Sequence, residues 1–139
     1  MKEAIQGYIQ QDGTFKNVNV KLAYEVPQTI EYPLVVITEI ANSENTRYTN
    51  LQGEQATNLT YQIESICQTT ELTDGNLLDA TRSAKLLATK ISKLLGGQDY
   101  KMRRVGDSAL RPINVDKTIM RYIERYETCL FENTLYRRY

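Results

Sequence analysis

The chain has 139 residues, 17 basic and 17 acidic side chains, a formal net charge of zero and no histidine. A chain of this length forms one domain around a single core, and its balanced charge argues against a general nucleic-acid binder, which normally carries a strong basic excess. The lack of histidine removes the commonest general base and metal ligand. We therefore expect a single domain over residues 1–139 that is not an enzyme and has no cofactor, metal or catalytic site.

The first half of the chain predicts a helix followed by three strands. Residues 1–11 have apolar side chains at helical spacing, and residues 18–24 alternate apolar and polar. Residues 32–40 form a β-branched apolar run that is typical of a central strand. Residues 59–67 alternate cleanly, which predicts an antiparallel hairpin with 32–40. The polar residues 41–58 between them are expected to form a long loop or an extended hairpin arm.

The strongest helix pattern covers residues 74–95. We expect Thr73 or Asp74 to cap its first turn and Gly96-Gly97 to end it. The continuous apolar stripe consists of Leu77, Ala80, Thr81, Ala84, Leu87, Ala88, Ile91, Leu94 and Leu95.

The last third predicts two more strands. The first covers residues 100–105, and residues 106–117 are expected to be a connection broken by Pro112. The second covers residues 118–131, and a polar C-terminal tail follows at 132–139. The order of elements predicts an α+β fold, with a central, mostly antiparallel sheet, two main helices packed on it and a long hairpin arm.

Two cysteines, Cys67 and Cys129, lie inside predicted strands. We expect both to be small buried apolar residues rather than a disulfide. No N-terminal stretch has the basic-then-apolar layout of a secretory leader, and no apolar run approaches the roughly 18 residues that cross a bilayer. We expect a protein that folds in a cytoplasm and has no membrane partner.

The final strand, 118–131, carries charges on both faces, whereas a strand in a soluble monomer usually has one apolar and one polar face. One face holds Arg121, Ile123, Arg125 and Glu127, and the other holds Tyr122, Glu124 and Tyr126. Two explanations stay open. The charges pair across strands within one sheet, or part of each face meets another subunit.

Three segments carry a resemblance to a known family. EYPLVVITEI is followed by the polar NSENTRYTN, and NLTYQIESIC leads through a polar stretch into the long helix. A proline-containing loop with Asp116 and Thr118-Ile119 then leads to arginine–tyrosine pairs on the final strand. In this order the chain resembles, over about residues 25–130, the tail-terminator or tail-completion proteins of tailed phages and prophages, which are also described as head–tail joining or minor capsid proteins.

The resemblance implies a tail-terminator-like domain that assembles into a hexameric ring. Such a ring caps the finished tail tube and joins it to the head connector, without any enzymatic activity. The implied partners are further copies of the chain, the major tail tube protein and a head-closure or connector protein, with nucleic acid at most passing through the ring lumen. The implied location is the head–tail neck of a virion that is assembled in the bacterial cytoplasm.

The resemblance also implies two sets of contact residues. The predicted subunit interface is Arg121, Tyr122, Glu124, Arg125, Tyr126 and Glu127. The part of the arm predicted to contact the tube or another partner is Asn45, Arg47, Tyr48, Asn50 and Gln52. Charge pairs across such an interface set register and partner choice more than affinity.

Two other functions remain as alternatives. One is a head-closure or adaptor protein of the same neck. The other is a small nucleic-acid-binding α+β domain that uses the basic segment 78–111 and exposed tyrosines for stacking. The basic residues of that segment are Arg82, Lys85, Lys90, Lys93, Lys101, Arg103, Arg104 and Arg111.

Overall fold

A computed structural model describes the backbone of residues 1–44, 54–97, 100–114, 116 and 118–133, and the side chains of these residues except 41–44, 54–58 and 129–133. The elements are α1 (Lys2–Asp12), β1 (Asn19–Leu22), the 3-10 helix η1 (Ala23–Glu25), β2 (Leu34–Glu44), β3 (Glu54–Cys67), β4 (Thr70–Glu71), β5 (Leu77–Leu78), α2 (Ala80–Leu95), β6 (Arg103–Pro112) and β7 (Met120–Asn133).

Five of the described strands form one sheet in the order β1-β2-β3-β7-β6, and β4 and β5 form a separate two-stranded hairpin. The pair β1–β2 is parallel, whereas the other three pairs of the main sheet are antiparallel. The predicted α+β class, with a mostly antiparallel sheet and two helices packed on it, is therefore confirmed.

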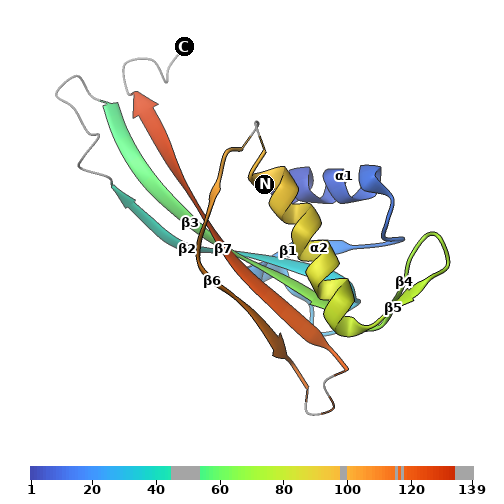
Figure 1. Cartoon of the computed structure of the whole chain (residues 1–139). Coiled ribbons are helices and arrows are strands. Elements are labelled where there is room, and N and C mark those ends of the chain that lie inside the picture. Colours follow the sequence, from blue (N-terminus) through green and yellow to red (C-terminus); the bar gives the residue numbers. More distant parts are fainter. Residues whose placement is uncertain (45–53, 98–99, 115, 117, 134–139) are drawn as a thin grey trace.

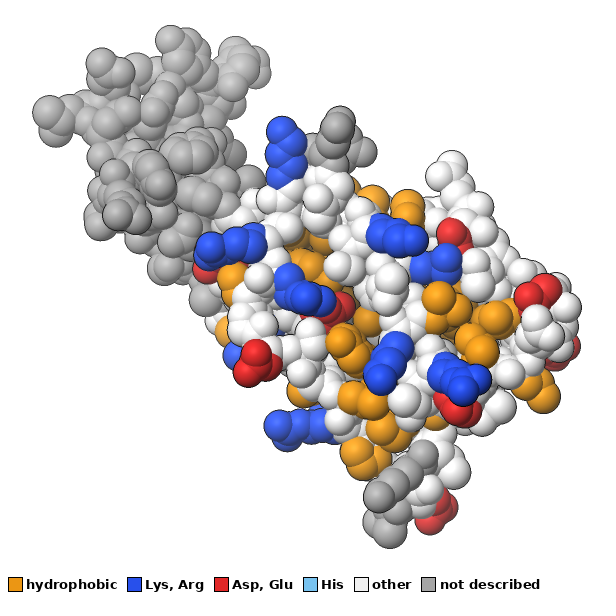
Figure 2. All heavy atoms as spheres, viewed as in Figure 1, with side chains coloured by type: hydrophobic (Ala, Val, Ile, Leu, Met, Phe, Trp, Pro, Cys, Tyr) orange, Lys and Arg blue, Asp and Glu red, His pale blue; other side chains and the backbone are white. Residues whose placement is uncertain are grey.

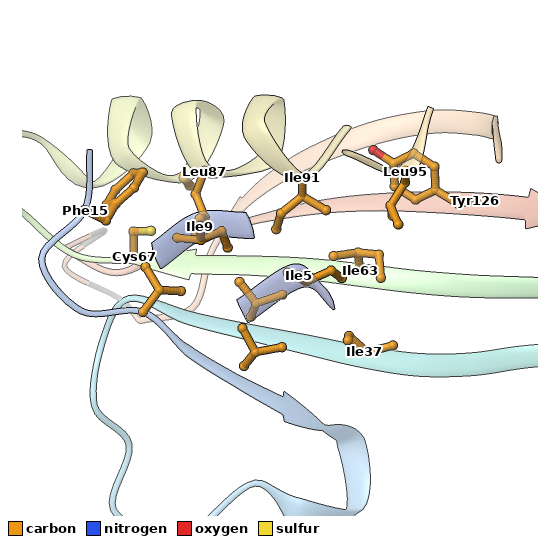
Figure 3. Close-up of a cluster of buried hydrophobic side chains, with 14 of the residues drawn as sticks. Ile5, Ile9, Phe15, Ile37, Ile63, Cys67, Leu87, Ile91, Leu95 and Tyr126 are labelled. Carbon is orange, nitrogen blue, oxygen red and sulfur yellow. The ribbon is translucent and has the colours of Figure 1, made fainter. Parts of the chain in front are cut away.

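Both helices cover the same face of the sheet (Figure 1). Their apolar sides meet alternate residues of the strands, because successive strand side chains point to opposite faces. Figure 3 shows this core between the helices and the sheet. Its buried members are Ile5, Ile9, Phe15, Val18, Val20, Val35, Ile37, Ile63, Cys67, Leu72, Ala84, Leu87, Ile91, Leu95 and Tyr126.

The predicted hairpin between residues 32–40 and 59–67 is confirmed, and it is longer than expected. Strand β2 continues to Glu44 and β3 begins at Glu54, so both ends of the predicted arm 41–58 are strand. Residues 45–53 lie outside the described part of the chain. The far ends of β2, β3 and β7 run together past both helices (Figure 1).

The long helix begins six residues later than the sequence indicated. The β4–β5 hairpin turns at Gly75, whose φ of 89° belongs to the left-handed region. The Asp74 carboxylate accepts the backbone N–H of Asn76 in this turn (2.9 Å). The predicted caps at Thr73 and Asp74 are therefore wrong, and Leu77, predicted for the buried stripe, is 70% exposed.

The true cap of α2 is Asp79, whose Oδ1 accepts the backbone N–H of Arg82 (2.8 Å). This contact satisfies one of the first-turn amides, which have no partner within the helix. The C-terminal end is as predicted, because the helix stops at Leu95 and Gly96 follows it.

The last two strands are present as predicted, with different bounds. Residues 106–117 were expected to be a connection, yet β6 continues to Pro112. A bulge between Val105 and Ala109 lets it continue, with Gly106 at a φ of 72°. Pro112 is tolerated because it lies at the end of an edge strand. Strand β7 confirms the predicted final strand, but it begins two residues later, at Met120, and continues to Asn133, two residues into the predicted tail 132–139.

Strand β1 is shorter than the predicted strand 18–24. After Leu22 the backbone turns into η1, because the Glu25 carboxylate accepts the Leu22 backbone N–H and pairs with Lys2, each at 2.9 Å. Cys67 is buried as predicted, and burial raises the pKa of its thiol to about 12. The side chain of Cys129 lies outside the described residues.

Replacing the cap of α2 should weaken the whole domain. We expect Asp79→Ala to lower the free energy of unfolding by about 1 kcal/mol, because an N-cap side chain is lost. Urea denaturation followed by far-UV circular dichroism measures the change. Asp79→Asn is the matched control and should remain near wild type, since asparagine caps equally well. Equal stability of the alanine variant would contradict the assigned start of α2.

Candidate functional site

An open groove of about 600 Å³ lies between α2 and the strands β6 and β7. Figure 2 shows Lys and Arg side chains spread over the face of the molecule that carries α2 and β6. The residues that line the groove are Lys85, Ala88, Thr89, Ser92, Lys93, Gly96, Arg104, Tyr122 and Glu124.

The floor of the groove holds a buried carboxylate. Glu124 is 4% exposed, and its Oε2 lies 2.9 Å from Nη1 of Arg104. The Ser108 hydroxyl donates to the same oxygen (3.3 Å), and the Tyr126 hydroxyl donates to Oε1 (3.1 Å). With three donors the charge is well compensated, as a buried carboxylate requires.

Tyr126 connects this carboxylate to the core. Its side chain is 1% exposed, and burial raises the pKa of its phenol to about 12, opposed in part by a hydrogen bond with Ser92 of α2. The phenol therefore stays protonated over the physiological range and donates to Glu124. Glu124 in turn raises the pKa of Arg104.

The strand register explains why these groups meet. Tyr126 lies opposite Tyr61 of β3 and Arg104 of β6. The bulge in β6 falls beside Glu124, because Val105 pairs with Arg125 and Ala109 pairs with Ile123. The extra β6 residues at this point bring Ser108 within reach of the carboxylate.

The helix wall of the groove carries two lysines that have no acidic partner among the described residues. Lys85, Thr89 and Lys93 follow at four-residue spacing and therefore share one side of α2. Within the part of the chain that the structure describes, neither Lys85 nor Lys93 forms a salt bridge, whereas the ammonium of Lys90 lies 3.0 Å from the Asp12 carboxylate. The lining thus holds three cations and one carboxylate.

Among the described residues, neither α1 nor α2 covers the other face of the sheet, where several charged residues pair across strands. Arg103 lies 3.0 Å from Glu127, and Arg121 lies 3.5 Å from Glu64. Arg125 donates to the side-chain oxygen of Gln62 (3.3 Å). Pairing within the chain therefore accounts for the charges of Arg103, Arg125 and Glu127, whereas Nε of Arg121 is buried without a hydrogen-bond partner.

The predicted interface residues separate into two groups. Glu124 and Tyr126 are buried in the folded chain, so neither offers surface to a neighbour. The remaining four, Arg121, Tyr122, Arg125 and Glu127, keep part of their surface, and their role between subunits stays a prediction. The predicted arm residues Asn45, Arg47, Tyr48, Asn50 and Gln52 lie outside the described residues.

Sequence reasoning missed the partners of Glu124. Arg104 lies 20 positions away and Ser108 lies 16 positions away, so no local pattern links them to Glu124. For the groove itself, the sequence does hold one signal. The four-residue spacing of Lys85, Thr89 and Lys93 predicts one cationic side of the helix.

Within the described ranges, no group of three or more Cys, Asp or Glu side chains is placed to hold a metal ion. The helices in those ranges are also too short or too polar to cross a membrane. Comparison with protein-family models and with curated proteins gave no match.

The buried phenol makes stability depend on alkaline pH. The folded pKa of Tyr126 is raised to about 12 from 10.0, so this stability is complete below pH 10 and is lost as the unfolded phenol ionises. A difference of two pKa units corresponds to at most about 3 kcal/mol. We expect the free energy of unfolding to fall more steeply between about pH 9.5 and 11.5 in wild type than in Tyr126→Phe.

Urea titrations at each pH measure this difference in slope. Both proteins contain Cys67, so the contribution of its thiol cancels in the comparison. Tyr24→Phe is the matched control, because Tyr24 is 85% exposed, and it should keep the wild-type slope. Parallel curves for wild type and Tyr126→Phe would contradict the buried, neutral phenol.

Proposed function

We propose that the chain is a structural virion protein of a tailed phage or prophage, a ring-forming tail terminator that caps the tail tube and joins it to the head connector. The resemblance over about residues 25–130 supports this, as does an α+β domain with two helices on a central sheet. The observation that carries the proposal is the end of the sheet that projects past the helices.

The projecting end is a three-stranded ribbon. Strand β1 pairs with β2 only from Leu34 to Ile37, and β6 pairs with β7 only as far as Glu127. Beyond these points β2, β3 and β7 continue together, with Glu54 opposite Asn133. Both long edges of the ribbon therefore lack a partner strand among the described residues.

Such edges suit assembly. An unpaired edge presents a row of backbone donors and acceptors that a strand from another subunit can complete. At about 3.3 Å per residue, the 14 residues of β7 span about 46 Å. That length lets one strand belong to the core at one end and to an intersubunit contact at the other.

The helix-free face supplies a second surface for assembly. This face carries Arg103, Arg111, Arg121 and Arg125. Among the described side chains, the acidic residues that pair with them are Glu64 and Glu127. Arg111 lies directly opposite Arg121, and Nε of Arg121 is buried without a hydrogen-bond partner. In a ring, each subunit offers two different surfaces to its neighbours, and this basic face would meet an acidic one.

A deletion at the end of the projecting ribbon should abolish capping of the tail tube without unfolding the domain. We expect deletion of residues 44–55 to leave the thermal unfolding of the domain close to wild type, because the core lies outside that segment, and to abolish capping of tail tubes. Tube length in electron micrographs, with and without added protein, measures capping. Full capping by the deletion variant would contradict the role of the ribbon.

Light scattering over a concentration series, alone and with tail-tube subunit, reports ring formation. A hexamer in either condition supports the proposal, whereas a monomer that ignores tubes at every concentration contradicts it. Pull-down with tail tubes against pull-down with portal–connector complex separates a terminator from a head-closure protein.

A further inference from the structure

The groove between α2 and the strands β6 and β7 has a use that the terminator role does not require. Its helix wall presents Lys85 and Lys93, its strand wall presents Arg104, and its lining includes Tyr122. We propose that this groove binds the phosphodiester backbone of a single-stranded nucleic acid. The proposal stands independently of tail-tube capping.

The local charge favours a polyanion although the chain as a whole is neutral. Glu124 is the only carboxylate in the lining, and Arg104, Ser108 and Tyr126 already occupy its oxygens. Lys85 and Lys93 have no acidic partner among the described residues, so their charge is available to a ligand. Local clusters of one sign in a groove concentrate oppositely charged ligands.

Arg104 can contact a ligand without leaving Glu124. It uses Nη1 for the carboxylate, and 55% of its side chain remains exposed. A guanidinium has five N–H donors in a fixed fork, so the others remain for a phosphate oxygen. The anchored end also holds the side chain in place, which reduces the entropy lost on binding.

The spacing on the helix fits a phosphate chain. Lys85 and Lys93 are eight residues apart, which corresponds to about 12 Å along the helix axis. Thr89 lies midway between them on the same side of α2. An extended strand that follows this wall therefore passes two ammonium groups and reaches Arg104 across the groove.

Tyr122 supplies the element that distinguishes a nucleic acid from a simple anion. It lines the groove and is only partly buried. Grooves that bind single strands combine cations that follow the backbone with aromatic side chains on which bases stack. A base that turns inward from the helix wall meets this ring.

Fluorescence anisotropy with a labelled 20-nucleotide oligo-dT tests the proposal on the full chain. We expect micromolar binding at about 50 mM salt that weakens as salt rises, with a log–log slope near −2 for three cations at about −0.7 each. Lys85→Gln/Lys93→Gln should weaken binding about tenfold and bring the slope near −0.7. Tyr122→Leu should weaken binding with little change in slope, because stacking releases no counterions.

The matched control is Lys16→Gln/Lys21→Gln. It removes the same charge away from the groove. Lys21 belongs to β1, the edge strand opposite β6, and Lys16 pairs with Glu71. It should bind as wild type does. Thermal melts establish that each variant is folded.

Three results would overturn the proposal: no binding by wild type at 50 mM salt, equal loss in both double variants, or equally tight binding of poly-glutamate. The last would assign the groove to acidic chains in general. None of these results changes the tube-capping assay, so the two proposals fail separately.

Discussion

The register of β7 between β3 and β6 is the constraint on which the rest of the structure depends. Its pairing with β3 runs without interruption from Met120 opposite Cys67 to Asn133 opposite Glu54. Because side chains alternate between faces, a slip of one residue would turn Tyr126 out of the core and bring Arg125 into it. The strand tolerates charges on both faces because each face supplies partners, Arg104 for Glu124 on one and Glu64 for Arg121 on the other.

This register gives the two faces of the sheet different roles. On one, Tyr126 packs beneath α2 with Ile91 and Leu95, and Glu124 marks the place where the core opens into the basic groove. On the other, Arg103 and Arg121 form ion pairs across strands, beside a small apolar cluster of Leu34, Val36 and Ile66. Strands β2, β3 and β7 then leave the core together as a ribbon (Figure 1) whose long edges have no partner strand among the described residues. The packing of the core, the basic groove and the projecting ribbon therefore all depend on the pairing of β7 with β3.

The sequence predicted the parts that depend on local periodicity. The apolar stripe at Leu87, Ile91 and Leu95 defined the long helix, and alternation defined the hairpin of β2 and β3. It did not predict where α2 begins, because a capping Asp79 and a turn at Asp74 look alike until the β4–β5 hairpin is known. It also missed the groove, because the bulge in β6 and the Arg104–Glu124 contact depend on register between strands, which periodicity does not encode.

A double-mutant cycle on Arg104→Gln and Glu124→Gln tests the central claim, that β7 is held by partners within its own chain. Urea unfolding of the four proteins should give a measurable coupling energy, larger than that of an exposed ion pair, because Glu124 is buried. The exposed pair Arg103 and Glu127, changed in the same way, should couple by less than about 0.5 kcal/mol. No coupling between Arg104 and Glu124 would contradict the register and the groove built on it.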